Sequence, residues 1–302
     1  MPKMWDRVRG LVARRGLPEA NCELQQRKTA GVYRAQEVPL GRRQPPGGGG
    51  FMKIAGLEKC SLIDYPGMLS AVCFTPGCNL NCFYCHNRDL LHDGARTTLA
   101  TEEVLHWLDK RRGFLDGVVI TGGEPTLQPD LAYFIRAVHA RGFKVKLDTN
   151  GVNPEALEAL LAEDLLDYVA MDVKAPPARY AEICGVRGAV PGVEASIDLL
   201  LNCAVDYEFR TTVIPQLAAV DVLDIAKWIQ GARLYVLQQF RRPANAGARD
   251  DIRNAAPPHR GDWPEAVLPL IRPLVTRCAL RGFDSVARQE KAPQSAAAML
   301  AD

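Results

Sequence analysis

The chain has 302 residues, of which 47% are hydrophobic and 24% are charged. This composition is typical of a globular protein and excludes wholesale disorder and collagen-like repeats. No apolar run approaches the length of a membrane span, so we expect no contact with membranes. The formal net charge is +2, but residues 1–51 carry ten basic and four acidic residues, which leaves the rest of the chain acidic on balance. We therefore expect no nucleic-acid partner.

Residues 1–51 are Arg-rich, show little hydrophobic periodicity and run into four glycines, Gly47 to Gly50. Such a segment cannot bury enough apolar surface to offset the entropy lost on ordering it. We predict a disordered basic extension translated from an upstream start, with Met52 as the working initiator; a basic interaction tail and a transit peptide are the alternatives. The segment has no secretory apolar region, so we expect a cytoplasmic protein. Residues 52–288 are expected to form the folded domain, and residues 289–302 a flexible tail.

From residue 52 onward, short apolar segments alternate with segments of helical periodicity. Strands are expected at residues 69–74, 118–120, 143–147, 168–173, 207–214 and 234–237. Six strands that alternate with helices predict an α/β fold, with a parallel sheet covered by helices. Strands this apolar are expected to be buried on both faces. Periodicity alone does not distinguish an open sheet from a barrel.

Local signals mark where the predicted helices and turns begin. Thr101 and Asp221 are predicted N-caps, and Asn153 is predicted to cap a helix that begins with Pro154. Tyr65-Pro66-Gly67-Met68 predicts a type II turn, because proline fixes the first central position and glycine accepts positive φ at the second.

The C-terminal part has weaker patterns. Residues 241–262 lack a long apolar pattern and are predicted to form a long loop that is functional or mobile. Residues 263–280 favour a helix, which Pro269 and Pro273 interrupt, and residues 283–287 favour a last strand.

Three of the cysteines are close together. The nine cysteines are at positions 22, 60, 73, 78, 82, 85, 184, 203 and 278, and Cys78, Cys82 and Cys85 form a C-x3-C-x2-C pattern in a loop that follows a strand. An odd number of otherwise scattered thiols argues against a disulfide framework. Three neighbouring thiolates can hold a soft metal ion or an iron–sulfur cluster.

The nature of this site depends on whether a fourth protein ligand exists. Structural zinc sites and ferredoxin-type clusters take four ligands, and the candidates here are Cys73 and His86. Cys73 lies in an apolar strand, where cysteine behaves as a small hydrophobe, and His86 directly follows Cys85. We interpret both as packing residues, which leaves one iron of a cluster open to a small molecule. A zinc-binding structural protein and a ferredoxin-like electron carrier with Cys73 as fourth ligand remain the alternatives.

The cysteine loop, with Tyr84 directly before Cys85, resembles the cluster loop of radical S-adenosylmethionine (SAM) enzymes. The resemblance implies a [4Fe–4S] cluster on the three cysteines, SAM on the open iron, and Tyr84 near the adenine. Thr121-Gly122-Gly123-Glu124-Pro125 resembles the family's GGEP motif, which implies that Gly122, Gly123 and Glu124 hold the amino group of SAM. The residue types suit this role, since glycines allow close approach to the backbone and carbonyl and carboxylate oxygens accept from an ammonium group.

Two further motifs end neighbouring strands, where α/β folds place their sites. Leu147-Asp148-Thr149-Asn150-Gly151 and Met171-Asp172-Val173-Lys174 are similar to segments of glycyl-radical-enzyme activases. This resemblance implies that Asp172 and Lys174 bind SAM. It also implies that Asp148, Thr149 and Asp172 hold a monovalent cation against the SAM carboxylate, and hard oxygens suit such a cation.

The resemblance extends from about Met52 to about Arg241 and is closest to anaerobic ribonucleoside-triphosphate reductase activating proteins. It implies a partial (β/α)6 barrel and an oxidoreductase that cleaves SAM reductively to a 5′-deoxyadenosyl radical. That radical takes a hydrogen atom from a glycine of a partner, here anaerobic ribonucleotide reductase. The chain has no second cysteine cluster, so the electron is expected from flavodoxin or ferredoxin. A pyruvate formate-lyase activase and a small-molecule synthase are the alternatives, and the Asp172–Lys174 segment disfavours the synthase.

Overall fold

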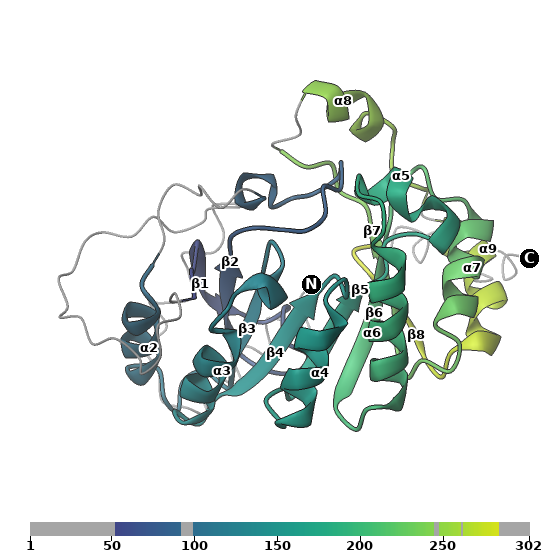
Figure 1. The fold of residues 1–302 in the computed structure, drawn as a ribbon. Helices are drawn as coiled ribbons and strands as arrows, with labels where there is room; N and C mark the ends of the chain where they lie inside the picture. The colour runs from purple at the N-terminus through teal and green to yellow at the C-terminus, as the bar shows by residue number, and fades with distance from the viewer. Residues whose placement is uncertain (1–51, 92–98, 245–247, 261, 284–302) are drawn as a thin grey trace, which may run out of the picture. The chain divides into compact units, whose positions relative to one another are not determined.

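The structure, a computed structural model, describes residues 52–91, 99–244, 248–260 and 262–283 (Figure 1). All of them belong to the compact unit Arg34–Asp302. The expected basic extension and most of the expected C-terminal tail and last strand lie outside the described residues. No helix in the described ranges is both long and apolar enough to span a membrane.

One sheet of eight strands forms the centre of the fold. Its strands follow chain order: β1 (Gly56–Ser61), β2 (Ser70–Thr75), β3 (Gly117–Gly122), β4 (Lys144–Thr149), β5 (Tyr168–Asp172), β6 (Asp206–Val213), β7 (Tyr235–Gln239) and β8 (Cys278–Arg281). β1 pairs antiparallel with β2, and all later neighbours are parallel. The predicted α/β fold with a parallel sheet is confirmed, and an open, curved sheet is consistent with a partial barrel.

The six expected strands correspond to β2–β7, and two strands were missed. β1 has the sequence GLEKCS, in which two adjacent charged residues break the apolar pattern. β8 lies at Cys278–Arg281, where the end of the helix expected over residues 263–280 was placed. β8 follows the turn at Pro273 and pairs with β7. This pairing joins residues that are far apart in the sequence, so no local sequence pattern predicts it.

Helices cover one face of the sheet (Figure 1). They are α2 (Thr101–Asp109), α3 (Leu131–His139), α4 (Pro154–Ala162), α6 (Val190–Asn202), α7 (Ala219–Trp228) and α9 (Trp263–Ile271). Two short helices, α5 (Tyr180–Cys184) and α8 (Ala248–Asn254), were not expected. The expected loop at residues 241–262 therefore contains a helix. The predicted interruption at Pro273 is seen as a 3₁₀ turn, Arg272–Leu274, whereas the one predicted at Pro269 is wrong, because Pro269 lies inside α9.

The two predicted N-caps are wrong, and both errors have the same physical cause. Helix α2 starts at Thr101, and the Glu103 carboxylate accepts the backbone N–H of Ala100 at 3.0 Å. In α7 the Asp221 carboxylate likewise accepts the N–H of Ala218 at 2.8 Å. An acidic side chain inside the first turn thus caps each helix from within, which is half of a capping box.

Of two other local predictions, one is confirmed in part and one in full. Helix α4 begins at Pro154 with Asn153 at the N-cap position, but the Asn153 side chain makes no capping hydrogen bond and donates instead to the carbonyl of Thr126 at 3.0 Å. In the turn before β2, Gly67 has φ of 75° and the N–H of Met68 donates to the carbonyl of Tyr65 at 3.2 Å, as a type II turn requires.

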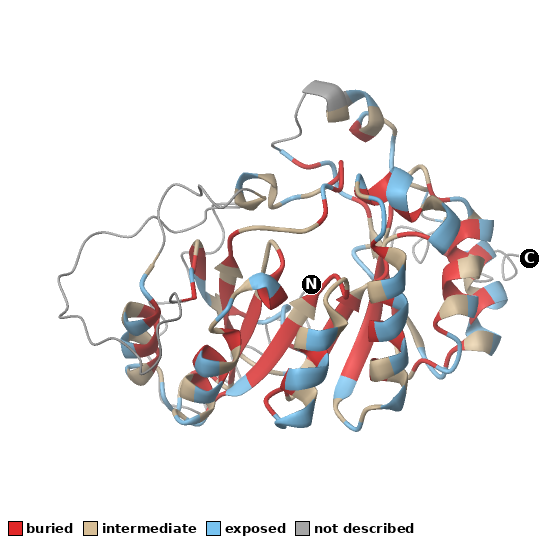
Figure 2. Cartoon of the chain, in the orientation of Figure 1, coloured by how far each residue is buried: buried red, intermediate tan, exposed pale blue. Residues whose placement is uncertain are grey.

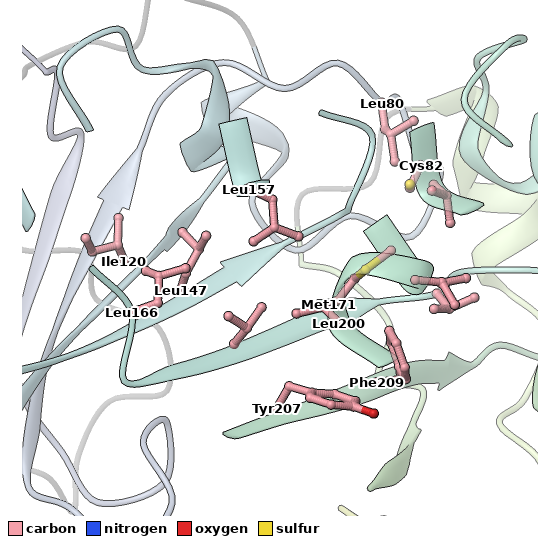
Figure 3. Packing of buried hydrophobic residues seen from close by; sticks show 14 of the residues in the cluster. Leu80, Cys82, Ile120, Leu147, Leu157, Leu166, Met171, Leu200, Tyr207 and Phe209 are labelled. Carbon is pink, nitrogen blue, oxygen red and sulfur yellow. The ribbon is translucent and has the colours of Figure 1, made fainter. Parts of the chain in front are cut away.

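The outward face of the sheet carries the main hydrophobic core. Ile120, Leu147, Met171 and Phe209 lie on successive strands and are fully buried against the helices (Figures 2 and 3). Each such side chain contributes roughly 1.5–3 kcal/mol through burial. This outer layer holds the strands in register and fixes the position of the loops at their carboxyl ends.

The inner face of the sheet differs from expectation. Tyr65, Val72 and Val119 form a small apolar cluster there, but β4 and β6 alternate charged and apolar residues and turn Lys146 and Glu208 inward, each only 1% exposed. Because side chains alternate along a strand, both faces of these strands are buried, as expected, but the inward face of this half of the sheet carries charged side chains. The interior of the partial barrel is charged.

Removal of residues 1–50 is expected to leave the folded unit intact. The side chain of Met52 is only 2% exposed, and its carbonyl accepts a hydrogen bond from the Thr101 hydroxyl at 2.9 Å. The truncated protein should therefore bind as much iron after anaerobic reconstitution as the full chain, and cleave SAM at the same rate. Loss of either property in the truncated protein would show that residues 1–50 are functional.

Candidate active site

One cavity of about 180 Å³ lies at the carboxyl ends of the parallel strands. It is lined by residues from all four motifs: Cys78, Cys82, Tyr84, Cys85, Gly122, Gly123, Asp148, Thr149, Asp172 and Lys174. Of the predicted site residues, Glu124 is the one that does not line it. The fold thus brings together segments that are up to about a hundred positions apart in the chain, as expected for a site at this end of parallel strands.

The cysteines lie in the loop between β2 and α2, of which residues 76–91 are described and are called the cluster loop below. Cys82 is buried and the other two cysteines are half-buried. Burial raises the pKa of Cys78 to about 11. A hydrogen bond with the Cys184 thiol lowers the pKa of Cys82 to about 7, against the opposing effect of burial.

The two candidate fourth ligands differ in position. Cys73 lies in β2, is fully buried in the hydrophobic core and does not line the cavity. Burial raises the pKa of its thiol to about 12, and its position in the core supports its interpretation as a packing residue. His86 instead lies in the cavity wall, where burial lowers its pKa.

In the described part of the chain, no three His, Cys, Asp or Glu side chains converge as ligands of a single metal ion. A [4Fe–4S] cluster does not require its cysteines to converge on a single metal ion, because each cysteine binds a different iron atom. Three thiols that line one cavity therefore suit a cluster.

Gly122 and Gly123 allow the turn after β3 to lie against the cluster loop. A Cβ at Gly123 would lie 1.9 Å from the carbonyl oxygen of Gly77, and one at Gly122 would lie 2.3 Å from the backbone nitrogen of Thr75. The N–H of Gly123 donates to the Thr75 carbonyl at 2.8 Å. We expected the glycines to make room for a ligand, and both line the cavity. They also allow the close approach to the backbone of Thr75 and Gly77.

Glu124 is fully buried and its carboxylate is used within the protein. It accepts hydrogen bonds from the N–H and hydroxyl of Thr126 at 3.1 and 2.7 Å, the Thr149 hydroxyl at 2.8 Å and the N–H of Asn150 at 2.7 Å. Three of these hydrogen bonds end on Oε1 and one on Oε2. The carboxylate therefore joins the turn after β3 to the end of β4, a positioning role that the sequence did not predict, and the expected contact of Glu124 with SAM stays a prediction.

Replacement of Glu124 is expected to destabilise the protein strongly. Glu124→Gln keeps the shape but turns an NH₂ group toward donors, and several hydrogen bonds to a charged acceptor are lost, which costs about 3 kcal/mol or more. Urea unfolding of the apo-protein measures the change, with the exposed Glu158→Gln on α4 as the control. Equal stability of the two variants would contradict this role.

Two carboxylates and three cations form a partly buried network at the cavity wall. Arg210 donates from Nε to Asp172 at 2.8 Å and from Nη1 to Asp148 at 3.3 Å, and Lys174 donates to Asp172 at 3.2 Å. Lys146 also pairs with Asp148. Burial would raise the pKa of both carboxyls, but the adjacent cations outweigh burial and hold both pKa values below their usual range. Asp148 and Asp172 are thus ionised.

Arg210 was not predicted as a site residue, and it changes the expectation of a monovalent cation. Its guanidinium bridges Asp148 and Asp172, the two carboxylates expected to hold that ion. The chain itself therefore supplies a cation at this position, and a bound metal ion would compete with it. The alternating pattern Asp206-Tyr-Glu-Phe-Arg210 is the signal that could have identified an inward-facing arginine.

Asn150 is a second residue that was not singled out. Its side-chain NH₂ donates to Oδ1 of Asn79 at 2.7 Å and lies 3.8 Å from the Sγ atom of Cys78, while its N–H donates to Glu124. Asn150 thus links the end of β4 to the cluster loop. Hydrogen bonds to cluster sulfurs influence reduction potential.

The chain is similar to known proteins over the part that forms the cavity. The sequence profile of the Radical SAM superfamily matches residues 72–229. "Putative glycyl-radical enzyme activating enzyme MJ1227" of Methanocaldococcus jannaschii is 40% identical over 193 residues, which cover 62% of this chain and 79% of that protein. The pyruvate formate-lyase-activating enzyme of Clostridium pasteurianum is 33% identical over 127 residues, 40% of this chain and 52% of that enzyme. The chain thus spans about half the length of the latter.

A solved structure supports the fold. Streptococcus suis SuiB bound to S-adenosylmethionine superimposes with a TM-score of 0.53 at 13% identity, over 67% of this chain and 48% of that chain.

The chain belongs to the radical SAM superfamily, because that profile matches more than half of it. It is homologous to glycyl-radical enzyme activating enzymes, and it is accordingly an oxidoreductase. The superfamily uses a [4Fe–4S] cluster and SAM, and the three cysteines beside a charged cavity fit both groups. The electron-carrier and zinc-protein alternatives are thereby wrong.

Proposed function

We propose that this protein is an activase that generates a glycyl radical on a partner enzyme, and that the partner is anaerobic ribonucleotide reductase. One observation carries the proposal: the three cysteines and the activase-like pair Asp172 and Lys174 line a single cavity. The 40% identity to the M. jannaschii protein, which extends over 79% of that protein, supports it.

The groups in the cavity suit the zwitterionic end of SAM. The Lys174 ammonium and the Arg210 guanidinium can each pair with a carboxylate, and Asp172 and the Gly123 carbonyl can accept from an ammonium group. When bound, the cluster and SAM supply a carbon-centred radical that removes a hydrogen atom. The role of the protein is to position the reactants and to exclude water. We place Cys78, Cys82 and Cys85 as cluster ligands and Tyr84 beside the adenine.

The choice of partner rests on the sequence segments that resemble the reductase-activating branch. Pyruvate formate-lyase-activating enzymes are also relatives, at 33% identity over about half of their length, and pyruvate formate-lyase is the second candidate partner. The chain has no second cysteine cluster, so we propose flavodoxin or ferredoxin as electron donor. We propose that the protein acts in the cytoplasm with these partners.

A panel of glycyl radical enzymes tests the choice of partner. Reconstituted protein, SAM and reduced flavodoxin are mixed anaerobically with anaerobic ribonucleotide reductase or with pyruvate formate-lyase, and the glycyl radical is measured by electron paramagnetic resonance. We expect the radical with the reductase and little with the lyase. A radical with the lyase alone would overturn the choice of partner but not the activase function.

A further inference from the structure

Helix α8 lies outside the residues matched by the superfamily profile, yet it contacts the loop that carries the cysteines. The side-chain NH₂ of Asn254 donates to the carbonyl of Phe83 at 2.9 Å. The Arg253 guanidinium lies 3.8 Å from the centre of the Phe83 ring. Phe83 lies between Cys82 and Cys85, and both it and Asn254 are at most 2% exposed. Helix α8 thus contacts both the backbone carbonyl and the ring of Phe83.

A second contact runs through Arg88. The Asp250 carboxylate pairs with Arg88 Nη2 at 2.6 Å. The same guanidinium donates from Nη1 to the carbonyl of Cys82 at 3.2 Å and from Nη2 to Oδ1 of Asn81 at 3.4 Å. Asp250 therefore orients a side chain that holds the backbone of Cys82. Two consecutive carbonyls, of Cys82 and Phe83, are tied to α8, one through Arg88 and one directly.

The other side of α8 is fixed to the barrel. The side-chain NH₂ of Gln216, which follows β6, donates to the carbonyl of Arg253 at 2.7 Å. Nη2 of Arg253 donates to the carbonyl of Glu182 in α5 at 3.2 Å. The contacts of α8 therefore transmit the position of β6 and α5 to the cluster loop. Figure 1 shows α8 next to α5, beyond the carboxyl ends of the strands.

We propose that α8 is a clamp that positions the [4Fe–4S] cluster, with Asn254 and Asp250 as its positioning residues. A loop with three cysteines and a single turn of 3₁₀ helix, Arg88–Leu90, has little regular structure to fix its ligands. Hydrogen bonds to two consecutive backbone carbonyls restrict the peptide that joins Cys82 to Cys85. The clamp acts on the cluster and not on the partner, so it does not rest on the proposed function.

The test uses full-length reconstituted protein and three measurements: the rate at which a ferrous chelator removes iron, the spectrum of the reduced cluster by electron paramagnetic resonance, and hydrogen exchange of the cluster loop. Asn254→Ala leaves the buried Phe83 carbonyl without its donor, and we expect iron release to be about tenfold faster. Asp250→Ala should act in the same direction by about twofold to fivefold, and Asp250→Glu should restore the wild-type rate.

Two controls separate a clamp from general destabilisation. Ile252→Ala changes the same helix at a side chain that is 83% exposed, and Val138→Ala removes buried volume from α3, on the outer face of the sheet. Both should release iron at the wild-type rate within about twofold, with an unchanged spectrum.

The proposal is supported if the Asn254 and Asp250 variants alone change the spectrum and the exchange of the cluster loop. It is overturned if Asn254→Ala releases iron no faster than Val138→Ala and has the wild-type spectrum. If Asn254→Ala fails to fold, Asp250→Ala and Asp250→Glu decide, because Asp250 is partly exposed: equal rates and spectra in these two variants and the wild type would also overturn the proposal.

Discussion

Replacement of any one of Cys78, Cys82 and Cys85 by alanine is expected to abolish cluster binding. Anaerobically reconstituted wild-type protein should bind about four irons per chain. The three cysteines line one cavity at the carboxyl ends of the strands, and the loss of one leaves an iron without its protein ligand. Iron and sulfide analysis of each variant measures the result.

The matched controls are the two residues considered as a fourth ligand. Cys73→Ala and His86→Ala should keep about four irons per chain, because Cys73 packs in the core and an open iron needs no further protein ligand. Loss of iron in Cys73→Ala, with wild-type folding by circular dichroism, would show that the cluster has four protein ligands and no site for SAM.

Replacement of Lys174 or Asp172 by alanine is expected to weaken SAM binding by about tenfold to a hundredfold while iron content stays unchanged. Loss of one charge-assisted hydrogen bond costs roughly 1.5–3 kcal/mol. Both residues line the cavity, and Asp172 is held ionised by Arg210 and Lys174. Equilibrium binding of SAM to the reconstituted protein gives the affinity.

A lysine at the amino end of a strand, away from the cavity, provides the control. Lys144 begins β4 and pairs with Asp167 at 2.6 Å, so Lys144→Ala should bind SAM as the wild type does. If Lys174→Ala and Asp172→Ala also bind SAM normally, the Asp172–Lys174 segment is a structural turn, and the preference for an activase over other radical SAM enzymes loses its main sequence support.

Much of the site could be predicted because its residues lie close to one another in sequence within four motifs. Each motif follows a strand, and parallel strands bring their carboxyl ends to one edge. Cys78, Gly122, Asp148 and Lys174 therefore line one cavity, although they lie at or just beyond the ends of four different strands.

The residues that were missed act across the fold. Cys184 contacts Cys82 from α5, Arg210 reaches Asp148 and Asp172 from β6, and Asn254 reaches Phe83 from α8. Such contacts depend on tertiary packing and leave no local pattern. Arg210 is the partial exception, because the alternation along β6 indicates an inward-facing polar row.

Glu124 shows how a motif can be identified while one role of a residue is missed. Its position beside two glycines suggested a ligand contact, and the fold also surrounds its carboxylate with donors from Thr126, Thr149 and Asn150. The hydrogen bonds of a buried group can be recognised only when the neighbouring loop is in place.

Transfer of a labelled hydrogen atom tests the activase function most directly. Anaerobic ribonucleotide reductase whose glycines carry deuterium at Cα is mixed with reconstituted protein, SAM and a reductant, and the 5′-deoxyadenosine formed is analysed by mass spectrometry. We predict one deuterium in that product, together with a glycyl radical signal on the partner, and neither with the Cys82→Ala variant. Formation of 5′-deoxyadenosine without deuterium, and without a radical on any glycyl radical enzyme of the panel, would contradict the activase function.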